Sequence, residues 1–342
     1  MRHDEETVAG LRVKLVGPAP VWLEAPGAAE ELRTVVLERD GEARTEGAPQ
    51  IVQLAASAFD DLPRVRRAFP ESVVVLDLTG EGDAELDRRR SRRARDADAV
   101  LAGSERELAD LRRRLGETFR STAAVDRPVD LQRFEPADVL AEEKGRGRDL
   151  RRFRRFHRLA GPLLLFAGPY TAAGGLDVLL EAVYALRASL PELRVAAIPH
   201  GPTEPGYRDR CEMRALGLGH HGIVEWTPAE EEVPFWYATA AVVCSLPRDA
   251  GSTEPPKRAA AAARPFVGTR GSFQGHVEDG VTGTLLESAD AQAAAGVLRT
   301  LIEDEATANA YGRAARARAE GEWSPATAAR ALRQVWQDLL GR

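Results

Sequence analysis

The chain of 342 residues carries a net charge of −6, and apolar residues make up 44% of it, enough to fill the cores of two α/β domains. The acidic balance argues against a nucleic-acid-binding protein. Cys211 and Cys244 stand in no metal-binding or redox spacing, which predicts a reducing compartment without disulfides. No secretory signal and no apolar run long enough to span a membrane occurs, so we expect a cytoplasmic protein.

In the first half, short apolar runs alternate with helical patterns, which predicts βα units around a parallel sheet. A helix is predicted over residues 82–95, and a second begins at Ser104, where Ser-Glu-Arg-Glu matches a capping box completed by Glu107. The predicted strands are residues 11–16, 34–37, 51–54, 73–78, 99–102 and 121–125.

Residues 136–148 are polar and contain two glycines, which predicts a linker between two domains. A basic helix follows, in which Phe153 and Phe156 alternate with arginines. At a spacing of three, Phe153, Phe156 and Leu159 share one helix face. Two interpretations stay open. The stripe packs on the domain with its arginines in water, or the segment from Arg146 to Arg158 makes a peripheral contact with the inner surface of a membrane.

The second half alternates more regularly, and it predicts a second parallel sheet. Its predicted strands are residues 163–167, 193–198, 223–226, 241–245 and 266–268. Its predicted helices are residues 176–190, 207–216, 233–240, 257–263, 290–303 and 305–321. A last helix begins at Ser324 with Pro325 at its first position, where the missing N–H is tolerated.

This pattern predicts an α/β protein of two doubly wound domains, whose ligands bind at the carboxyl ends of the strands. We predict an N-terminal domain over residues 1–148 and a C-terminal domain over residues 149–323. A helix over residues 324–342 would cross back to the N-terminal domain.

Several blocks of the second half resemble one known family. They are GPLLLFAGPYTAAGGLDVLLEA at the start of residues 161–202, and the sequences of residues 207–228, 233–247 and 264–286. In order and spacing they resemble family 4 glycosyltransferases over residues 161–340, as do residues 96–116 and 127–138, whereas residues 1–95 match poorly. The resemblance implies a GT-B fold, in which two Rossmann-like domains face each other across a cleft. It also implies a retaining transfer of a sugar from a nucleoside diphosphate on the C-terminal domain to an acceptor on the N-terminal domain.

A diphosphate needs N–H donors and positive potential, which glycine turns and helix N-termini supply. The turn after the first strand of the second half, the helix start at residues 252–258 and the loop after residues 266–268 meet this need. His200 follows a strand, and the resemblance implies that residues 225–228 approach the nucleobase through their backbone. The predicted donor-binding residues are Gly168, Thr171, Gly174, Gly175, His200, Gly201, Glu225, Trp226, Thr227, Lys257, Arg258, Arg270, Gly271 and Ser272.

The first loop departs from the family. The family has an arginine after the strand glycine and a lysine before the second glycine, and both contact the diphosphate. Pro169 and Gly174 stand at these positions, so two cations are missing. We hypothesise that Lys257, Arg258, Arg248 or Arg270 supplies the positive charge instead. The glutamate expected after the later glycine-rich turn is also missing, because Gly275 stands there.

The family's paired glutamates can be placed in two registers. One register puts them at Ala250 and Arg258, and the other, shorter by about one helical turn, puts them at Glu254 and Ala262. Glu254 is therefore the one candidate for a catalytic carboxylate, with helix capping as its alternative role.

The first domain departs from the family as well. Its first loop reads GPAPVWLEAPG over residues 17–27, without the paired glycines of the family. Gln53 stands where the family often has a histidine, and Asp77 ends a strand at the cleft side.

We expect an active glycosyltransferase whose partners are a nucleotide-sugar donor and an unidentified acceptor. A rival hypothesis is a non-catalytic relative that binds a nucleotide, a glycan or a partner subunit, and a third is another GT-B reaction such as sugar-phosphate transfer or epimerisation. No tight metal site is predicted, no cofactor is required, and a Mg²⁺ ion on the nucleotide is not indicated.

Overall fold

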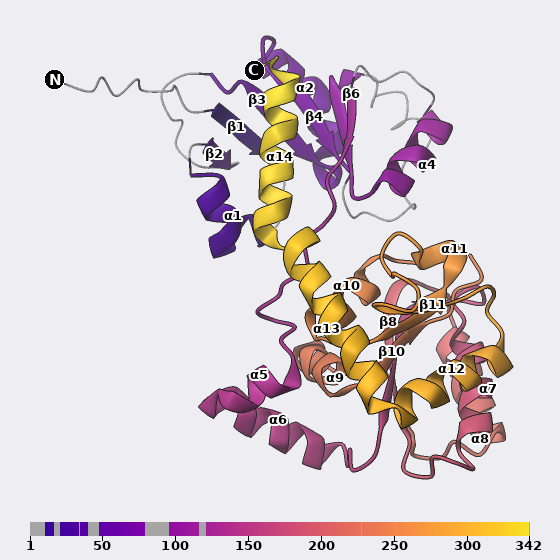
Figure 1. The fold of residues 1–342 in the computed structure, drawn as a ribbon. Coiled ribbons are helices and arrows are strands. Elements are labelled where there is room, and N and C mark those ends of the chain that lie inside the picture. The colour runs from indigo at the N-terminus through magenta and orange to yellow at the C-terminus, as the bar shows by residue number, and fades with distance from the viewer. Residues whose placement is uncertain are drawn as a thin grey trace. The chain divides into compact units, whose positions relative to one another are not determined.

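The computed structural model describes residues 11–16, 21–33, 35–39, 48–78, 96–115, 121–226, 228–249 and 251–341. The chain divides into two compact units (Figure 1). Unit 1 comprises Met1–Pro128 together with Trp323–Arg342, and unit 2 comprises Val129–Glu322. The border after Pro128 lies twenty residues before the predicted one at 148, and the C-terminal residues group with unit 1.

Unit 1 is built on one parallel sheet with the strand order β2-β1-β3-β4-β5-β6. The predicted helix over residues 82–95 and Thr34 lie outside the described residues. The strands are β1 (Leu11–Val16), β2 (Val35–Arg39), β3 (Ile51–Ala55), β4 (Val73–Asp77), β5 (Ala99–Ala102) and β6 (Ser121–Ala124). The helices are η1 (Val21–Glu24), α1 (Pro26–Glu31), η2 (Ala56–Asp61), α2 (Leu62–Ala68), α4 (Glu105–Leu115) and α14 (Pro325–Leu339).

The two faces of this sheet follow the alternation of its side chains, because successive residues of a strand point to opposite sides. One face packs Ile51 and Val75 against Trp336 of α14, which Figure 1 shows lying across the strands. The other face packs Val52 and Val74 against α2.

The first of the two hydrogen bonds of the predicted capping box is present before α4. The Glu107 N–H donates to Ser104 Oγ at 3.1 Å. The Glu107 carboxylate accepts from the Gly103 N–H at 2.9 Å.

Unit 2 has a second parallel sheet with the order β12-β11-β10-β7-β8-β9. The strand order reverses between β7 and β10, and ligands of open α/β sheets bind at the carboxyl ends of the strands at such a point. The strands are β7 (Leu163–Tyr170), β8 (Arg194–Thr203), β9 (Val224–Trp226), β10 (Val242–Ser245), β11 (Phe266–Thr269) and β12 (Gly283–Leu286). The predicted α/β architecture of two doubly wound sheets is confirmed.

The helices of unit 2 correct two predictions. Residues 137–148 are not a linker, because Leu140 and Leu150 pack on Ala238 and make the segment helical. The helix predicted over residues 257–263 begins at Glu254, since prolines are tolerated in its first turn. The helices are α5 (Ala137–Glu142), α6 (Lys144–Phe156), α7 (Leu176–Leu186), α8 (Tyr207–Gly217), η4 (Glu230–Glu232), α9 (Val233–Thr239), α10 (Glu254–Ala261), α11 (Arg270–Phe273), α12 (Ala291–Glu303) and α13 (Glu305–Glu322).

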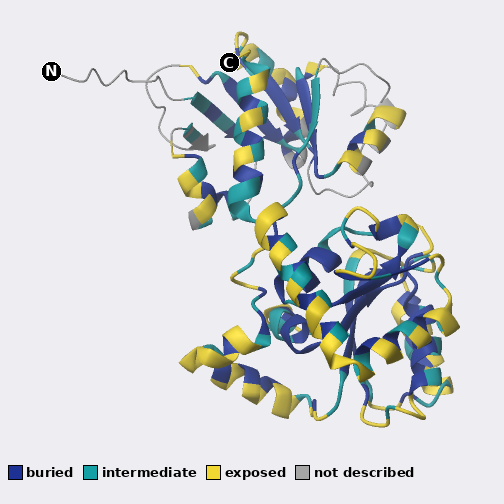
Figure 2. Ribbon diagram, in the orientation of Figure 1, coloured by how far each residue is buried: buried dark blue, intermediate teal, exposed yellow. Residues whose placement is uncertain are grey.

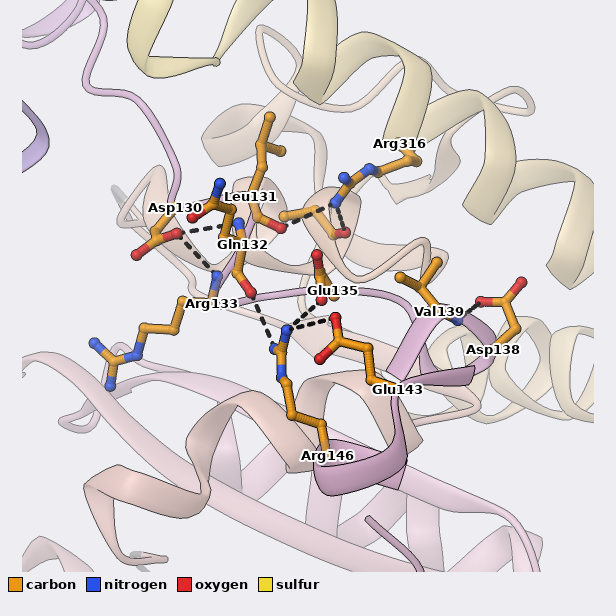
Figure 3. A network of polar contacts seen from close by, with 11 residues as sticks. Asp130, Leu131, Gln132, Arg133, Glu135, Asp138, Val139, Glu143, Arg146 and Arg316 are labelled. Carbon is orange, nitrogen blue, oxygen red and sulfur yellow. Dashed lines mark hydrogen bonds and ion pairs between the residues drawn. The ribbon is translucent and has the colours of Figure 1, made fainter. Parts of the chain in front are cut away.

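The first residues of unit 2 are fastened by a polar network (Figure 3). Asp130 Oδ1 accepts the N–H groups of Gln132 and Arg133 at 3.1 and 2.9 Å, which fixes a tight turn. Arg146 of α6 donates to the Gln132 carbonyl at 3.0 Å and forms an ion pair with Glu135. These bonds tie the segment after Pro128 to α6, which is why the border between the units precedes this segment.

Candidate functional site

The loops that follow β7 and β10 lie against each other at the carboxyl edge of the unit 2 sheet. The Arg248 N–H donates to the Ala173 carbonyl at 2.7 Å. A Cβ on Gly175 would come within 1.8 Å of the Leu246 carbonyl oxygen, and one on Gly168 within 2.8 Å of Ser245 Oγ. Gly175 therefore lets the two loops approach closely at the point where the strand order reverses, while Gly168 lies within β7 and not in the loop, and leaves room for the Ser245 side chain of the neighbouring β10.

Gly174 and Gly175 are both required by the turn itself. A Cβ on Gly174 would lie 2.0 Å from the Pro169 carbonyl oxygen, and Gly175 has a φ of 81°. The Gly174 N–H donates to the Thr171 carbonyl at 2.9 Å. Because that bond closes the turn, the Gly174 N–H is already used within the protein.

Arg248 fastens the same two loops with its side chain. Its guanidinium pairs with both carboxylate oxygens of Asp177 in α7, at 3.1 and 2.7 Å, and donates to the Ala172 carbonyl at 2.7 Å. Burial would raise the pKa of Asp177, but the hydrogen bond and charge of Arg248 outweigh burial and hold that pKa below its ordinary value. The charge of Arg248, one of the hypothesised replacement cations, is thus offset locally.

Arg270 is also paired with carboxylates. It lies 2.6 Å from Asp279 and 2.7 Å from Glu287, so two acidic groups offset its charge. Ser272, two residues later, is buried and its hydroxyl donates to the Asp249 carbonyl. A Cβ on Gly271 would meet no atom within 4 Å, which makes Gly271 the open position of this loop.

Helix α10 holds the remaining predicted cations, Lys257 and Arg258. Lys257 is fully buried, with 0% of its surface exposed. Arg258 stays partly exposed, pairs with Glu254 at 3.4 Å and places its guanidinium 5.2 Å from the centre of the Phe134 ring. The Phe134 ring in turn contacts Tyr237 edge to face at 5.4 Å. Arg258, in the last turn of α10, is therefore held by a carboxylate from the first turn of the same helix and by an aromatic ring.

His200 lies within β8 instead of after it, and the charges of Arg258 and Glu254 in α10 act on its ring. Burial, reinforced by the positive charge of Arg258, lowers the pKa of His200 from 6.5 to about 4, while Glu254 and Glu230 oppose the shift. The ring is therefore neutral at pH 7 and carries one N–H donor and one acceptor nitrogen. Gly201 follows with a φ of 91°, a conformation that side chains rarely adopt.

The segment predicted to approach a nucleobase begins at the edge strand β9. The Glu225 carboxylate points to α6, where it lies 3.9 Å from His157 Nδ1, and the Glu232 carboxylate lies 3.1 Å from His157 Nε2. Trp226 is half-buried against the core of unit 2. Thr227 lies outside the described residues. The Glu225 side chain is thus engaged with α6, which leaves its backbone as the group that a ligand could contact.

The basic helix α6 packs by one stripe, as predicted, except for one residue. Leu150, Phe153 and Leu159 are buried, and Phe153 contacts Trp236 edge to face at 4.8 Å. Phe156 is 76% exposed, because a spacing of three leaves it about 60° away from Phe153 around the helix. In Figure 2 α6 is coloured mainly as exposed. Its exposed residues include Arg148, Arg151, Arg152, Arg154 and Arg155, and Arg158 in the turn that follows is exposed as well.

Sequence patterns predicted only some of the residues that surround α10 at this edge of the sheet. His200, Glu254 and Arg258 were predicted, whereas Glu230 and Phe134 were not. Glu230 lies in a glutamate run typical of a solvated turn, and Phe134 comes from a segment distant in sequence, so no pattern marked either. Sequence analysis likewise missed a bond in unit 1, where the Gln53 amide donates to Asp77 at 2.8 Å.

Within the described residues, no group of three or more His, Cys, Asp or Glu side chains could hold a metal ion. Among the helices in that part of the chain, none combines the length and apolar character needed to cross a bilayer.

Comparisons with known proteins bear on this site. Residues 161–304 match the family described as "Glycosyl transferases group 1". A "D-inositol 3-phosphate glycosyltransferase" of Streptomyces avermitilis is 32% identical over 233 residues, which cover 66% of this chain and 48% of the relative. The chain thus spans about half the length of this relative. The resemblance to glycosyltransferases is confirmed.

Two solved structures share the fold. A glycosyltransferase from Rickettsia africae superposes with a TM-score of 0.74 at 13% identity, over 97% of this chain and 99% of that one. Anabaena Alr3699/HepE, solved in complex with UDP and glucose, superposes with a TM-score of 0.69 at 14% identity, over 95% and 99% of the two chains. The fold is that of the GT-B glycosyltransferases.

Proposed function

Because its C-terminal unit matches the group 1 glycosyltransferases, we propose that this chain transfers a sugar from a nucleoside diphosphate donor to an acceptor hydroxyl, with retention. Unit 2 would bind the donor and unit 1 the acceptor. The observation that carries the proposal is the ion pair of Glu254 and Arg258 on α10, beside the carboxyl edge of a doubly wound sheet, whose charges also act on His200 of β8. Nucleotides bind at this edge in related α/β folds.

The donor diphosphate would be held differently from the family's usual pattern. Arg258, whose side chain is 22% exposed, would supply the positive charge, and the neutral His200 would add a hydrogen-bond donor. The start of α11, at Gly271, would also lie beside the diphosphate. Glu254 would hold Arg258 in place or contact the donor's hydroxyl groups, and backbone groups near Glu225 and Trp226 would meet the base.

A panel of nucleoside diphosphate sugars tests this proposal. We expect at least one donor to raise the unfolding temperature and to be hydrolysed slowly without an acceptor. Arg258→Met should weaken donor affinity roughly 10- to 100-fold, since it removes a charged hydrogen bond. Arg299→Met, at an exposed arginine of α12, is the matched control and should change nothing. Equal affinity in the two variants would refute the role of Arg258.

A second function is favoured by the charges of the first loop. Pro169 and Gly174 carry no charge, and Arg248 and Arg270 are paired with carboxylates. A site with so little free positive charge suits a non-catalytic protein that binds a nucleotide, a glycan or a partner subunit. The same panel decides between them, because binding without hydrolysis or transfer, for all donors and acceptors tried, would support the non-catalytic function. Adding EDTA tests whether Mg²⁺ accompanies the nucleotide.

The acceptor is proposed to be a polyhydroxylated compound, since the relative from Streptomyces avermitilis is named for D-inositol 3-phosphate.

We also propose a peripheral contact of α6 with the inner, anionic membrane surface, because its exposed face combines Arg151, Arg152 and Arg155 with Phe156. Sedimentation with phosphatidylcholine vesicles, with and without phosphatidylglycerol, tests the contact. Phe156→Ser should reduce binding to the anionic vesicles, and equal binding to both vesicle types would refute it.

A further inference from the structure

A chain of polar side chains crosses unit 1 from α14 to the carboxyl edge of its sheet. Trp336 Nε1 donates to Gln53 Oε1 at 2.8 Å, and Gln53 Nε2 donates to Asp77 Oδ2 at 2.8 Å. Trp336 is fully buried and Gln53 is 3% exposed, whereas Asp77 is partly exposed. The chain therefore begins in the core and ends on a partly exposed carboxylate.

The chemistry of the three groups fixes the direction of these bonds. An indole N–H can only donate, so the Gln53 carbonyl oxygen must face Trp336. The amide nitrogen must then face Asp77, and a carboxylate is the acceptor that such a donor needs. Trp336 thus sets the orientation of the Gln53 amide, and the amide sets the orientation of the Asp77 carboxylate.

Gln53 is an unfavourable residue for packing at this position. Its neighbours along β3, Val52 and Leu54, are fully buried, and Ile51 on its own face packs in the apolar layer beneath α14. Burying an amide in such a layer is unfavourable unless both of its ends are hydrogen-bonded. Apolar residues at positions 53 and 336 would fill the same layer without polar atoms. What the polar pair adds is an oriented carboxylate at the end of β4.

Asp77 is the last residue of β4 and pairs in register with Ala55, the last residue of β3. β3 lies beside β1, where the strand order of this sheet changes direction. Ligands of open α/β sheets bind beyond the carboxyl ends of such strands. A carboxylate there accepts hydrogen bonds from hydroxyl groups and repels phosphate.

We propose that Asp77, positioned by Gln53 and Trp336, binds uncharged hydroxyl groups of a cyclic polyol or sugar acceptor. This inference rests on the proposed function, because it assigns the acceptor side of that reaction to unit 1. Asp77 would be a binding residue, while Gln53 and Trp336 would be positioning residues.

Asp77→Asn in the full chain tests the binding residue. The asparagine carbonyl can still accept from Gln53, so the fold is kept while the charge is lost. Saturation-transfer NMR titrations with myo-inositol and with methyl α-D-mannopyranoside measure affinity. We expect saturable binding of at least one probe to the natural protein and binding about 10-fold weaker to Asp77→Asn. Glu71→Gln, at an exposed carboxylate of the same unit, should bind as the natural protein does.

Gln53→Met tests the positioning residues, because it removes both hydrogen bonds at similar volume. If Gln53 only stabilises the fold, Gln53→Met should lower the unfolding temperature but leave polyol affinity unchanged at temperatures where the variant is still folded. If Gln53 positions Asp77, polyol binding should be weaker at those temperatures as well.

Donor binding on the same proteins separates the two proposals. The role of Asp77 would be overturned if neither polyol probe bound the natural protein. It would also be overturned if the probes bound Asp77→Asn and the natural protein with equal affinity. Intact polyol binding without any donor binding would overturn the proposed function instead.

Discussion

Arg248, Arg258 and Arg270 at the carboxyl edge of unit 2 have the same charge but different neighbours. Arg248 and Arg270 each meet carboxylates at 2.6 to 2.7 Å, which offsets their charge. Arg258 meets Glu254 at 3.4 Å and lies beside a neutral histidine. Since the potential at a site depends on the neighbours of a cation, the positions of arginines in the sequence could not reveal which of them acts on a ligand.

The half-buried His200 predicts a specific dependence of stability on pH. Its pKa is about 4 in the folded chain and 6.5 ordinarily, so between these values the unfolded chain binds a proton that the folded chain does not. The free energy of unfolding should therefore fall as the pH drops from 6.5 to 4, by about 1–3 kcal/mol from this residue. Urea unfolding at pH 7 and pH 4.5 measures the fall. His200→Gln should show a smaller one, and an equal fall in both proteins would contradict the assignment.

The turn at Gly175 predicts a strong effect of one added methyl group. Gly175→Ala would strain a residue with a φ of 81° and push a Cβ to within 1.8 Å of the Leu246 carbonyl oxygen. We expect a destabilisation of about 2–5 kcal/mol and a loss of nucleotide binding. Gly217→Ala is the control, since nothing lies within 4 Å of that Cβ, and it should be neutral or slightly stabilising. Thermal unfolding of both variants decides the matter.

At the scale of elements, the loops of unit 2 are joined to one another by side chains. Arg248 ties the loop after β10 to the start of α7, and Thr269 at the end of β11 donates to the Pro247 carbonyl at 2.8 Å. The Ser272 hydroxyl adds a bond to the Asp249 carbonyl. Three consecutive strand ends are thus connected where the ligand is proposed to bind, so the loops form one supported surface.

The pairing of Arg248 with Asp177 can be measured by a double-mutant cycle. Both side chains are partly exposed, at 42% and 34%, so solvent weakens the pair. We expect Arg248→Met and Asp177→Asn to be coupled by about 1 kcal/mol, with the double variant little worse than either single one. Urea unfolding gives the coupling, and hydrogen exchange of residues 171–175 should rise in all three variants. Strict additivity would show that the two loops are held by other contacts.

The strands of unit 2 could be predicted because each one is a short apolar run between turn residues, as in residues 163–167 and 241–245. The helical structure of residues 137–148 could not be predicted. Its few apolar residues are recognisable as core residues only once they are seen to pack on Ala238, which is distant in sequence. The start of α10 was misplaced because Pro255 and Pro256 suggest a loop. At the candidate site, residue types and loops were predictable, but the burial of Lys257 depends on packing between distant elements.

At the scale of the whole molecule, the chain enters unit 2 after Pro128 and leaves it at Glu322. Unit 2 is therefore one continuous segment, whereas unit 1 is completed by residues from the far end of the chain. Ala329, Leu332 and Trp336 of α14 are all buried in the core that includes Val13, Ile51 and Val75. The N-terminal strands and the C-terminal helix thus depend on each other.

This arrangement predicts selective unfolding when the C-terminal residues are removed. A chain that ends at Trp323 loses α14, and with it the burial of Leu332 and Trp336, worth several kcal/mol out of the roughly 5–15 kcal/mol that stabilise a domain. The truncation also leaves Gln53 without its indole partner. Hydrogen exchange followed by mass spectrometry should show lost protection in β1, β3 and β4 and native protection in β7 and β8. Nucleotide binding by unit 2 should persist. A chain shortened only after Leu340 should behave as the natural protein, and protected strands in the longer truncation would show that unit 1 folds without its C-terminal helix.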